Sequence, residues 1–280
     1  MRTRIIAKLD CKPPYVIKPV LFDGVRKVGT PNELAKKYYN EGVDEIIYLD
    51  VVSSLYDKPI DLNCISNFAI KKFIPLAVGG GIKSLSDAEK LFHNGADKIV
   101  INTSSIETPE ILKDISYSYG NQSIVVHIEA KKINGEYFCF TECGRNNSGM
   151  KVKDWIKELN KGVAGEILIQ SIDFDGLMSG FDDQLFDLTM THSKIPVILS
   201  SGFSSINNIK EAIENLKQLM KDRDDANKLV ESKTVLLGNC DAKIMQLHKK
   251  HGSLEQKLEH TQDQLTEYES LKQEFAAYHL

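Results

Sequence analysis

The first half of the chain is repeated in the half that follows, and this internal repeat constrains the fold more than any other feature. Three apolar, strand-like runs recur at an offset of about 120 residues. The paired runs begin at Ile5 and Val125, at Glu45 and Glu166, and at Ile74 and Ile195. Each run is rich in β-branched residues, ends in an acid or a glycine, and is followed by a helical stretch. The repeat therefore predicts two half-domains of alternating strands and helices.

The repeated unit predicts a barrel. Two copies of four strand–helix units give eight parallel strands, which close into a (β/α)8 TIM barrel of roughly 250 residues. The chain has 280 residues, so we expect the barrel over residues 1–240, with its eighth strand at about 233–238. A helical extension is expected over 241–280. In such barrels the chemistry lies on the loops that follow the carboxyl ends of the strands.

The composition limits the class of protein without defining its function. Hydrophobic residues make up 42% of the chain, and the formal net charge of -4 leaves no basic surface for nucleic acid or an anionic membrane. No run is long enough to span a bilayer and no apolar leader precedes the first strand, so we expect a cytoplasmic protein. The five cysteines are dispersed, and the close pair Cys139 and Cys143 lacks the further ligands of a zinc site. Free thiols, no metal and no cofactor are expected.

Glycines and polar residues at two neighbouring strand ends indicate an anion site. Gly79–Gly81 follows an apolar run, and glycines there let backbone N–H groups approach an anion. The next strand ends in Asn102–Ser104, whose amides and hydroxyls could close on the same oxygens. A pair of tight turns is the plainer interpretation of these residues. Because Ser200–Gly202 is the counterpart in the second half, we expect two facing anion sites for a substrate with a phosphate at each end.

The motifs of the chain resemble those of a known family, the cyclase subunit of imidazole glycerol phosphate synthase, from Arg4 to about Glu214. The motifs that carry the resemblance are Arg4–Ala7, Leu9–Asp10, Asp44–Glu45, Val78–Ile82, Gly95–Lys98, Ile101–Thr103, Gly165–Leu168, Ser171–Asp173 and Asp175–Gly176. In that family a class I glutaminase releases ammonia, which passes up the barrel. The cyclase uses this ammonia to close an imidazole ring on a bis-phosphorylated, nucleotide-derived substrate while cleaving it.

The resemblance implies roles for individual residues. One carboxylate from each half, Asp10 and Glu129, would serve as general acid or base. Substrate and phosphate contacts would fall on Lys18, Asp50, Gly80, Gly81, Asn102, Thr103, Ser171, Asp175, Ser201 and Gly202. Two carboxylates held apart on one rim can hold different protonation states, which suits proton transfer at two points. The simpler alternative is that each acid caps the helix that follows it.

Four further charges, Arg4, Glu45, Lys98 and Glu166, fall at the beginnings of strands. In the similar family, a ring of alternating charges closes the lower end of the barrel and gates ammonia from the docked glutaminase. Paired charges could equally seal the barrel bottom for structural reasons, since desolvated charges must be paired. The expectation of a glutaminase docking at this end therefore rests on the resemblance.

The sequence departs from the family pattern close to the predicted catalytic pair. Glu129 stands where the family has an aspartate, and its extra methylene changes the reach of the carboxylate. Lys8 lies two residues before Asp10, so strand alternation points its side chain into the barrel, where the family has a small uncharged residue. We expect Glu129 or Asp50 to pair with this ammonium. His127 should also point inward, as a hydrogen-bonded core residue.

These departures leave alternative functions open. Pro13–Pro14 and Lys18–Pro19 replace glycine-containing positions and would stiffen a loop expected to close over substrate. Relatives that work beside glutaminases in the amidation of surface-polysaccharide sugars look similar to this chain in the Glu129 pattern and in a basic residue near Lys8. If residues 233–238 do not close the barrel, a non-catalytic scaffold becomes the third alternative.

The carboxyl-terminal region has the pattern of a long helix. Apolar residues at spacings of three and four form the seam of a coiled coil. The seam consists of Ile244, Leu247, His251, Leu254, Leu258, Thr261, Leu265, Tyr268 and Phe275. A helix packed on the barrel, an antiparallel hairpin with residues 217–232 and a self-associating coil all fit this pattern.

Overall fold

The structure is a computed structural model of the chain. It describes residues 4–56, 58, 60–69, 74–203 and the single positions 205, 210, 214, 215, 218, 221 and 253. The chain divides into two compact units, Met1–Leu219 and Met220–Leu280, and all strands of the described residues belong to the first. The predicted eighth strand at 233–238, the predicted boundary at 240 and the coiled-coil seam lie outside the described residues.

A curled parallel sheet forms the centre of the first unit. Its parallel strands within the described residues are β1 (Ile6–Lys12), β4 (Glu45–Asp50), β5 (Leu76–Gly79), β6 (Lys98–Ile101), β7 (Ile124–Ile133), β10 (Glu166–Ser171) and β11 (Val197–Ser200). Each strand pairs in parallel with the next one in this order. Sequential parallel neighbours joined by helices are the arrangement of a (β/α)8 barrel, so the predicted fold class is confirmed.

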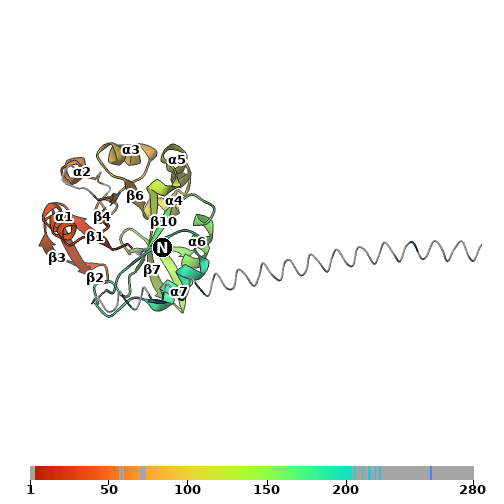
Figure 1. The fold of residues 1–280 in the computed structure, drawn as a ribbon. Helices are drawn as coiled ribbons and strands as arrows, with labels where there is room; N and C mark the ends of the chain where they lie inside the picture. Colours follow the sequence, from red (N-terminus) through yellow and green to blue (C-terminus); the bar gives the residue numbers. More distant parts are fainter. Residues whose placement is uncertain are drawn as a thin grey trace, which may run out of the picture. The chain divides into compact units, whose positions relative to one another are not determined.

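Helices cover the outside of the sheet (Figure 1). They are α1 (Pro31–Asn40), α2 (Leu62–Ala69), α3 (Leu85–His93), α4 (Thr103–Glu107), α5 (Glu110–Tyr119), the 3-10 turn η1 (Asn121–Ser123), α6 (Val152–Leu159) and α7 (Asp183–His192). Side-chain caps start several of them. Thr30 forms a capping box with Glu33 ahead of α1, and Ser84 caps α3. These caps position the helices that follow β3 and β5.

A β-hairpin extends the first strand of each half. After β1 the chain forms β2 (Tyr15–Val20) and β3 (Asp23–Gly29), and after β7 it forms β8 (Glu136–Thr141) and β9 (Asn146–Lys151). Both hairpins are antiparallel to the strand from which they continue. Figure 1 shows the first hairpin in red beside β1. The repeat predicted from the sequence therefore includes these excursions as well as the parallel strands.

The strand register corrects the alignment of the two halves by one residue. In β1, Ile6 pairs with the first residue of β4, and in β7, Val125 pairs with the first residue of β10. The repeat therefore aligns Ile6 with Val125, and the predicted match of Ile5 with Val125 is wrong. A slip of one residue would turn every side chain to the opposite face of the sheet. The observed register makes Asp10 and Glu129 counterparts.

Two hydrophobic clusters lie on the two faces of the sheet. The larger cluster joins the sheet to the helices and contains the buried residues Leu112 and Ile156. The smaller cluster consists of Ile47, Leu49, Ala77, Val100, Val125 and Leu168, with Ile6, Val51 and Ile198 packed against it. On β4, β6 and β10 these residues lie two or four positions after the charged residue that begins each strand. They therefore share its face, which places the smaller cluster in the barrel interior.

Candidate functional site

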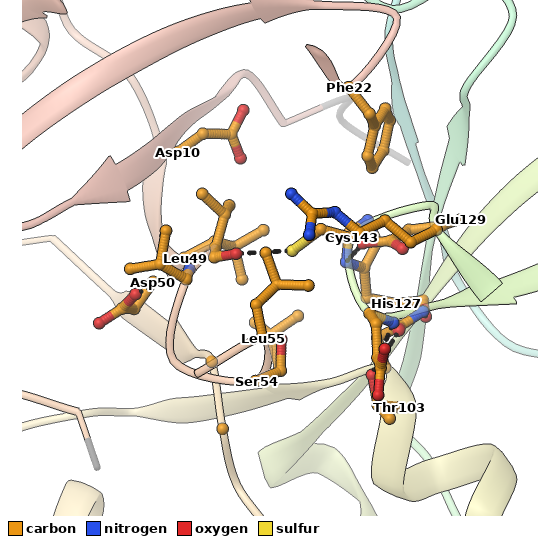
Figure 2. A pocket seen from close by; sticks show the side chains of 18 of the residues that line it. Asp10, Phe22, Leu49, Asp50, Ser54, Leu55, Thr103, His127, Glu129 and Cys143 are labelled. Carbon is orange, nitrogen blue, oxygen red and sulfur yellow. Dashed lines mark hydrogen bonds and ion pairs between the residues drawn. The ribbon is translucent and has the colours of Figure 1, made fainter. Parts of the chain in front are cut away.

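A cavity of about 380 Å3 lies at the carboxyl ends of the strands and is lined by both halves of the repeat. Asp10 comes from β1 and Glu129 from β7. Figure 2 shows the two carboxylates on opposite sides of this cavity. The structure therefore brings the two predicted catalytic residues to one site, and their roles stay predictions.

Lys8 is paired with Asp10 inside the barrel. The Lys8 ammonium lies 2.6 Å from Asp10 Oδ1 and donates to Gln170 Oε1 at 3.0 Å. The inward direction predicted for Lys8 is observed, because it lines the cavity with a side chain only 16% exposed. The predicted partners Glu129 and Asp50 are wrong. Residues two apart on one strand share a face, so Asp10 lies beside Lys8 on the inward face of β1.

Glu129 is buried and holds its proton at neutral pH. Burial raises the pKa of this carboxyl from 4.5 to about 8, although the N–H of Gly144 donates to its Oε2 at 2.8 Å and opposes the shift. A carboxyl of this kind is suited to donate a proton. Glu129, the carboxyl of the second half, therefore keeps its proton, whereas its counterpart Asp10 forms an ion pair with Lys8.

His127 is neutral. Burial, followed by the charge of Lys8, lowers the pKa of His127 to about 3. Its Nε2 lies 2.9 Å from Gln170 Oε1, so this nitrogen carries the hydrogen and donates. Its Nδ1 is 3.8 Å from Glu129 Oε1, which is too long for a hydrogen bond. The predicted role of a hydrogen-bonded core residue fits this geometry.

The glycines after β5 lie against the loop after β4. Gly80 has a φ of +122° and Gly81 a φ of +60°, and both line the cavity. A Cβ on Gly80 would overlap the backbone carbonyl of Asp50, so no other residue fits at this close approach. Asp50 is fixed in turn, because its Oδ1 accepts from the N–H groups of Val52 and Ser53 at 3.0 Å. The predicted anion cradle is therefore a rigid turn at the cavity wall.

Asn102 and Thr103 line the cavity but use their side chains within the protein. Asn102 Nδ2 donates to the carbonyls of His127 and Phe140 at 3.0 and 3.1 Å. Thr103 Oγ1 donates to Asn102 Oδ1 and accepts from the N–H of Glu142, both at 3.1 Å. These side-chain groups hold the two halves of the barrel together. An anion at this wall would therefore meet the backbone of the turn, and not the hydroxyl group expected from the sequence.

Lys18 is not brought to the cavity. It lies exposed on β2, where its neighbours Ile17 and Pro19 line the cavity. Successive side chains of a strand point to opposite faces, so Lys18 faces away when both neighbours face inward. The sequence did not show that this segment is a strand, and the predicted substrate contact of Lys18 is absent from the described cavity lining.

Three other predicted contacts are not among the residues that line the described cavity. Ser171 follows an inward residue of β10 and therefore points toward α7, where its hydroxyl donates to Asp182 Oδ2 at 2.8 Å. Ser201, at a φ of +88°, donates to Asp175 Oδ1 at 3.3 Å. The carbonyl of Gly202 accepts from the N–H of Gly180. Ser171, Ser201 and Gly202 are not among the residues that line the described cavity, whereas Asp175 is.

The four charges at the strand beginnings form a closed ring of ion pairs at the other end of the sheet. Arg4 contacts Glu45 at 2.8 Å and Glu166 at 2.6 Å, and Lys98 contacts the same two carboxylates at 3.2 and 3.1 Å. Each carboxylate is thus shared by two cations. Desolvation raises the pKa of Glu45, and the neighbouring cations oppose this rise. The ring lies at the lower end of the barrel, and its role as a gate stays a prediction.

Sequence reasoning missed several residues of the site. Gln170 lies at the centre of the hydrogen bonds described above, and Gly144 supplies the N–H that contacts Glu129. Phe22 and Arg145 also line the cavity. Gln170 could have been found, because it is a polar residue in an apolar strand and shares the inward phase of Glu166.

The described part of the chain contains neither a candidate metal site nor a candidate membrane span. No group of three or more His, Cys, Asp or Glu side chains there is arranged to hold a metal ion. No helix there has the length and apolar character of a membrane span. The thiols of Cys139 and Cys143 have pKa values raised by burial to about 12.

The fold and the site define a class: a duplicated (β/α) barrel whose cavity brings together Asp10 and Glu129, the corresponding carboxyls of the two halves. Residues 4–220 match the model of the family described as histidine biosynthesis protein. Curated relatives are imidazole glycerol phosphate synthase subunits HisF. The protein from Legionella pneumophila is 45% identical over 204 residues, covering 72% of this chain and 96% of the relative. Those from Natranaerobius thermophilus and Sulfolobus acidocaldarius are each 41% identical over 203 residues, covering 72% of this chain and 81% and 82% of the relatives. The chain belongs to the histidine biosynthesis protein family, in its HisF group.

Proposed function

We propose that this chain is the cyclase subunit of an imidazole glycerol phosphate synthase. It would use ammonia to close an imidazole ring on a bis-phosphorylated, nucleotide-derived substrate and cleave that substrate. The observation that carries the proposal is the pair of carboxyl groups, one from each half of the repeat, on opposite sides of one cavity. The matches to HisF subunits support the same function.

The two carboxyls differ in charge, and this difference suits acid–base catalysis. Asp10 is held in an ion pair with Lys8 and is the better candidate for the base. Glu129, whose pKa is raised to about 8 by burial, is the better candidate for the acid. Ring closure and cleavage require a proton to be taken at one point and delivered at another, and groups poised in opposite states can do both.

The cavity walls support binding of the substrate phosphates. The turn at Gly80 and Gly81 presents backbone without a side chain in the way, beside the turn of Asn102 and Thr103. We infer that one phosphate binds there. Asp175, Ser201 and Gly202 lie together in the second half and would contribute to the second phosphate site after a local rearrangement.

Ammonia would come from a partner glutaminase docked at the lower end of the barrel. The ring of Arg4, Glu45, Lys98 and Glu166 lies at that end and would act as its gate. The apolar layer above the ring favours passage of neutral ammonia over ammonium, because a charge in an apolar interior is costly.

Amidation of a surface-polysaccharide sugar and a non-catalytic scaffold are the alternatives raised by the sequence. The relatives reported above are named as subunits of imidazole glycerol phosphate synthase, which favours the synthase proposal over both alternatives. The ordered cavity and its paired charges also argue against a scaffold.

The test supplies ammonium salt as the amine source, so that no partner is needed. The purified chain should convert the bis-phosphorylated precursor into an imidazole product, measured by chromatography. The Asp10→Asn variant should lose about 1,000-fold in kcat while its substrate Kd stays within about threefold, which is the range of general acid–base effects. Asp114→Asn, an exposed change on α5, is the control. Normal turnover by the Asp10→Asn variant would refute the assignment.

A further inference from the structure

Gln170 lines the cavity and connects groups from β1, from β7 and from the loop after β10. Its side chain is 2% exposed and lies on β10. Its Oε1 accepts from Lys8 Nζ at 3.0 Å and from His127 Nε2 at 2.9 Å. Its Nε2 donates to Asp175 Oδ1 at 3.0 Å. The orientation of the amide is therefore determined, since only the oxygen can face an ammonium and an N–H, and only the nitrogen can face a carboxylate.

Lys8 is held at two points. An ammonium on a four-carbon stem is flexible and loses rotamer entropy when it is fixed. Two acceptors, Asp10 Oδ1 and Gln170 Oε1, fix it in this chain. Because His127 donates to the same Gln170 oxygen, that oxygen cannot rotate away from Lys8 without leaving the imidazole N–H unpaired. The direction of the Lys8 ammonium is thus set from the far side of the barrel.

Asp10 is positioned by the same contacts. The Asp10 side chain is 15% exposed, and its Oδ1 accepts a hydrogen bond from Lys8 Nζ at 2.6 Å. An ion pair this short, and largely removed from water, limits the rotation of the carboxylate and stabilises its negative charge. Displacement of Lys8 would remove both effects.

We propose that Lys8 and Gln170 are positioning residues that hold Asp10 in its reactive geometry, with Gln170 acting through Lys8. The inference rests on the proposed function, because it takes Asp10 as the group that contacts the substrate. Neither residue was assigned such a role from the sequence. A methionine at either position keeps a similar length and removes the hydrogen bonds, so Lys8→Met and Gln170→Met are the informative variants.

Each variant should lower kcat about 10- to 100-fold while KM stays within about twofold, since a small misplacement of a catalytic group has effects of this size. The assay is the ammonium-dependent reaction under steady-state conditions, with the substrate varied in excess over the protein. Lys131→Met, an exposed change on β7, is the matched control and should keep the wild-type rate. If Gln170→Met does not fold, as judged by circular dichroism, Lys8→Met alone decides the outcome.

The decisive measurement repeats both changes in the Asp10→Asn background. If Lys8 and Gln170 act through Asp10, neither change should lower the residual rate of that variant by more than about twofold, because effects of residues acting as a unit are not additive. Additive losses, or a rise in KM at constant kcat, would overturn the inference. A fully active Asp10→Asn variant would instead refute the proposed function, so the two failures can be told apart.

Discussion

The buried carboxyl of Glu129 makes stability depend on pH. In the folded chain burial raises its pKa to about 8, against 4.5 for the free group. Between these two values the folded state keeps a proton that the unfolded chain has released. The contribution of Glu129 to stability is therefore fully present below about pH 4.5 and is lost as the pH rises toward 8. Glu129→Gln removes this dependence, because the amide is neutral at every pH.

His127 contributes with the opposite sign. Its pKa falls from 6.5 to about 3, so the unfolded chain binds a proton that the folded chain excludes, and stability is lost as the pH falls below 6.5. The slopes of stability against pH that come from Glu129 and from His127 cancel between about pH 4.5 and 6.5. From there to about pH 8 only the Glu129 slope remains, and at about 1.4 kcal/mol per pH unit the folded state loses about 2 kcal/mol.

The measurement is urea unfolding followed by tryptophan fluorescence. The chain has one tryptophan, Trp155, which is 4% exposed and lies in the first unit, so its signal reports that unit. The free energy of unfolding of the unaltered chain should fall by about 2 kcal/mol from pH 6.5 to 8, whereas that of Glu129→Gln should stay constant within about 0.5 kcal/mol. Glu110→Gln, at an exposed position, should behave like the unaltered chain. Parallel curves for Glu129→Gln and the unaltered chain would refute the assignment of a buried, protonated carboxyl.

Two further changes test the barrel ends. Lys98→Met should lower the free energy of unfolding by about 3 kcal/mol, because the buried Glu45, whose side chain is 2% exposed, loses one of its two cations. Thermal unfolding at pH 7 measures this loss, and an unchanged midpoint would contradict the prediction. Gly80→Ala should destabilise by about 2 kcal/mol more than Gly135→Ala. Both glycines have positive φ, but only at Gly80 would a Cβ meet the backbone of Asp50, and equal losses would show that crowding is unimportant.

The fold could be predicted from the sequence because the repeat shows the same strand–helix order twice. Strand alternation then gave the inward direction of Lys8 and His127 without coordinates. The cavity location of Asp10 and Glu129 followed from the same reasoning, since both stand at the carboxyl end of the first strand of a half. These predictions depend only on period and order, which a single sequence carries.

Contacts within a layer of the barrel could not be predicted in the same way. The partner of Lys8 depends on side-chain distances, and sequence alternation does not separate Asp10 from Glu129. Ser171 was assigned to the substrate because its motif matched, yet one step along β10 turns it to the helix side, where Asp182 accepts its hydrogen bond. A motif gives the identity of a residue but does not establish which face of the strand it serves.

The inward side chains of the barrel form three layers: a charged ring, an apolar layer and a polar layer. This order explains how the predicted gate and the predicted site can share one interior. The ring at the strand beginnings shares its charges among four residues, and the hydrophobic layer above it contains residues such as Val100 and Leu168. The next layer is polar again, with Lys8 and Gln170. Coulomb attraction between the two polar layers would be strong across an apolar gap if either layer carried an unpaired charge. Because each layer pairs its own charges, neither layer presents an unpaired charge to the other across the apolar gap.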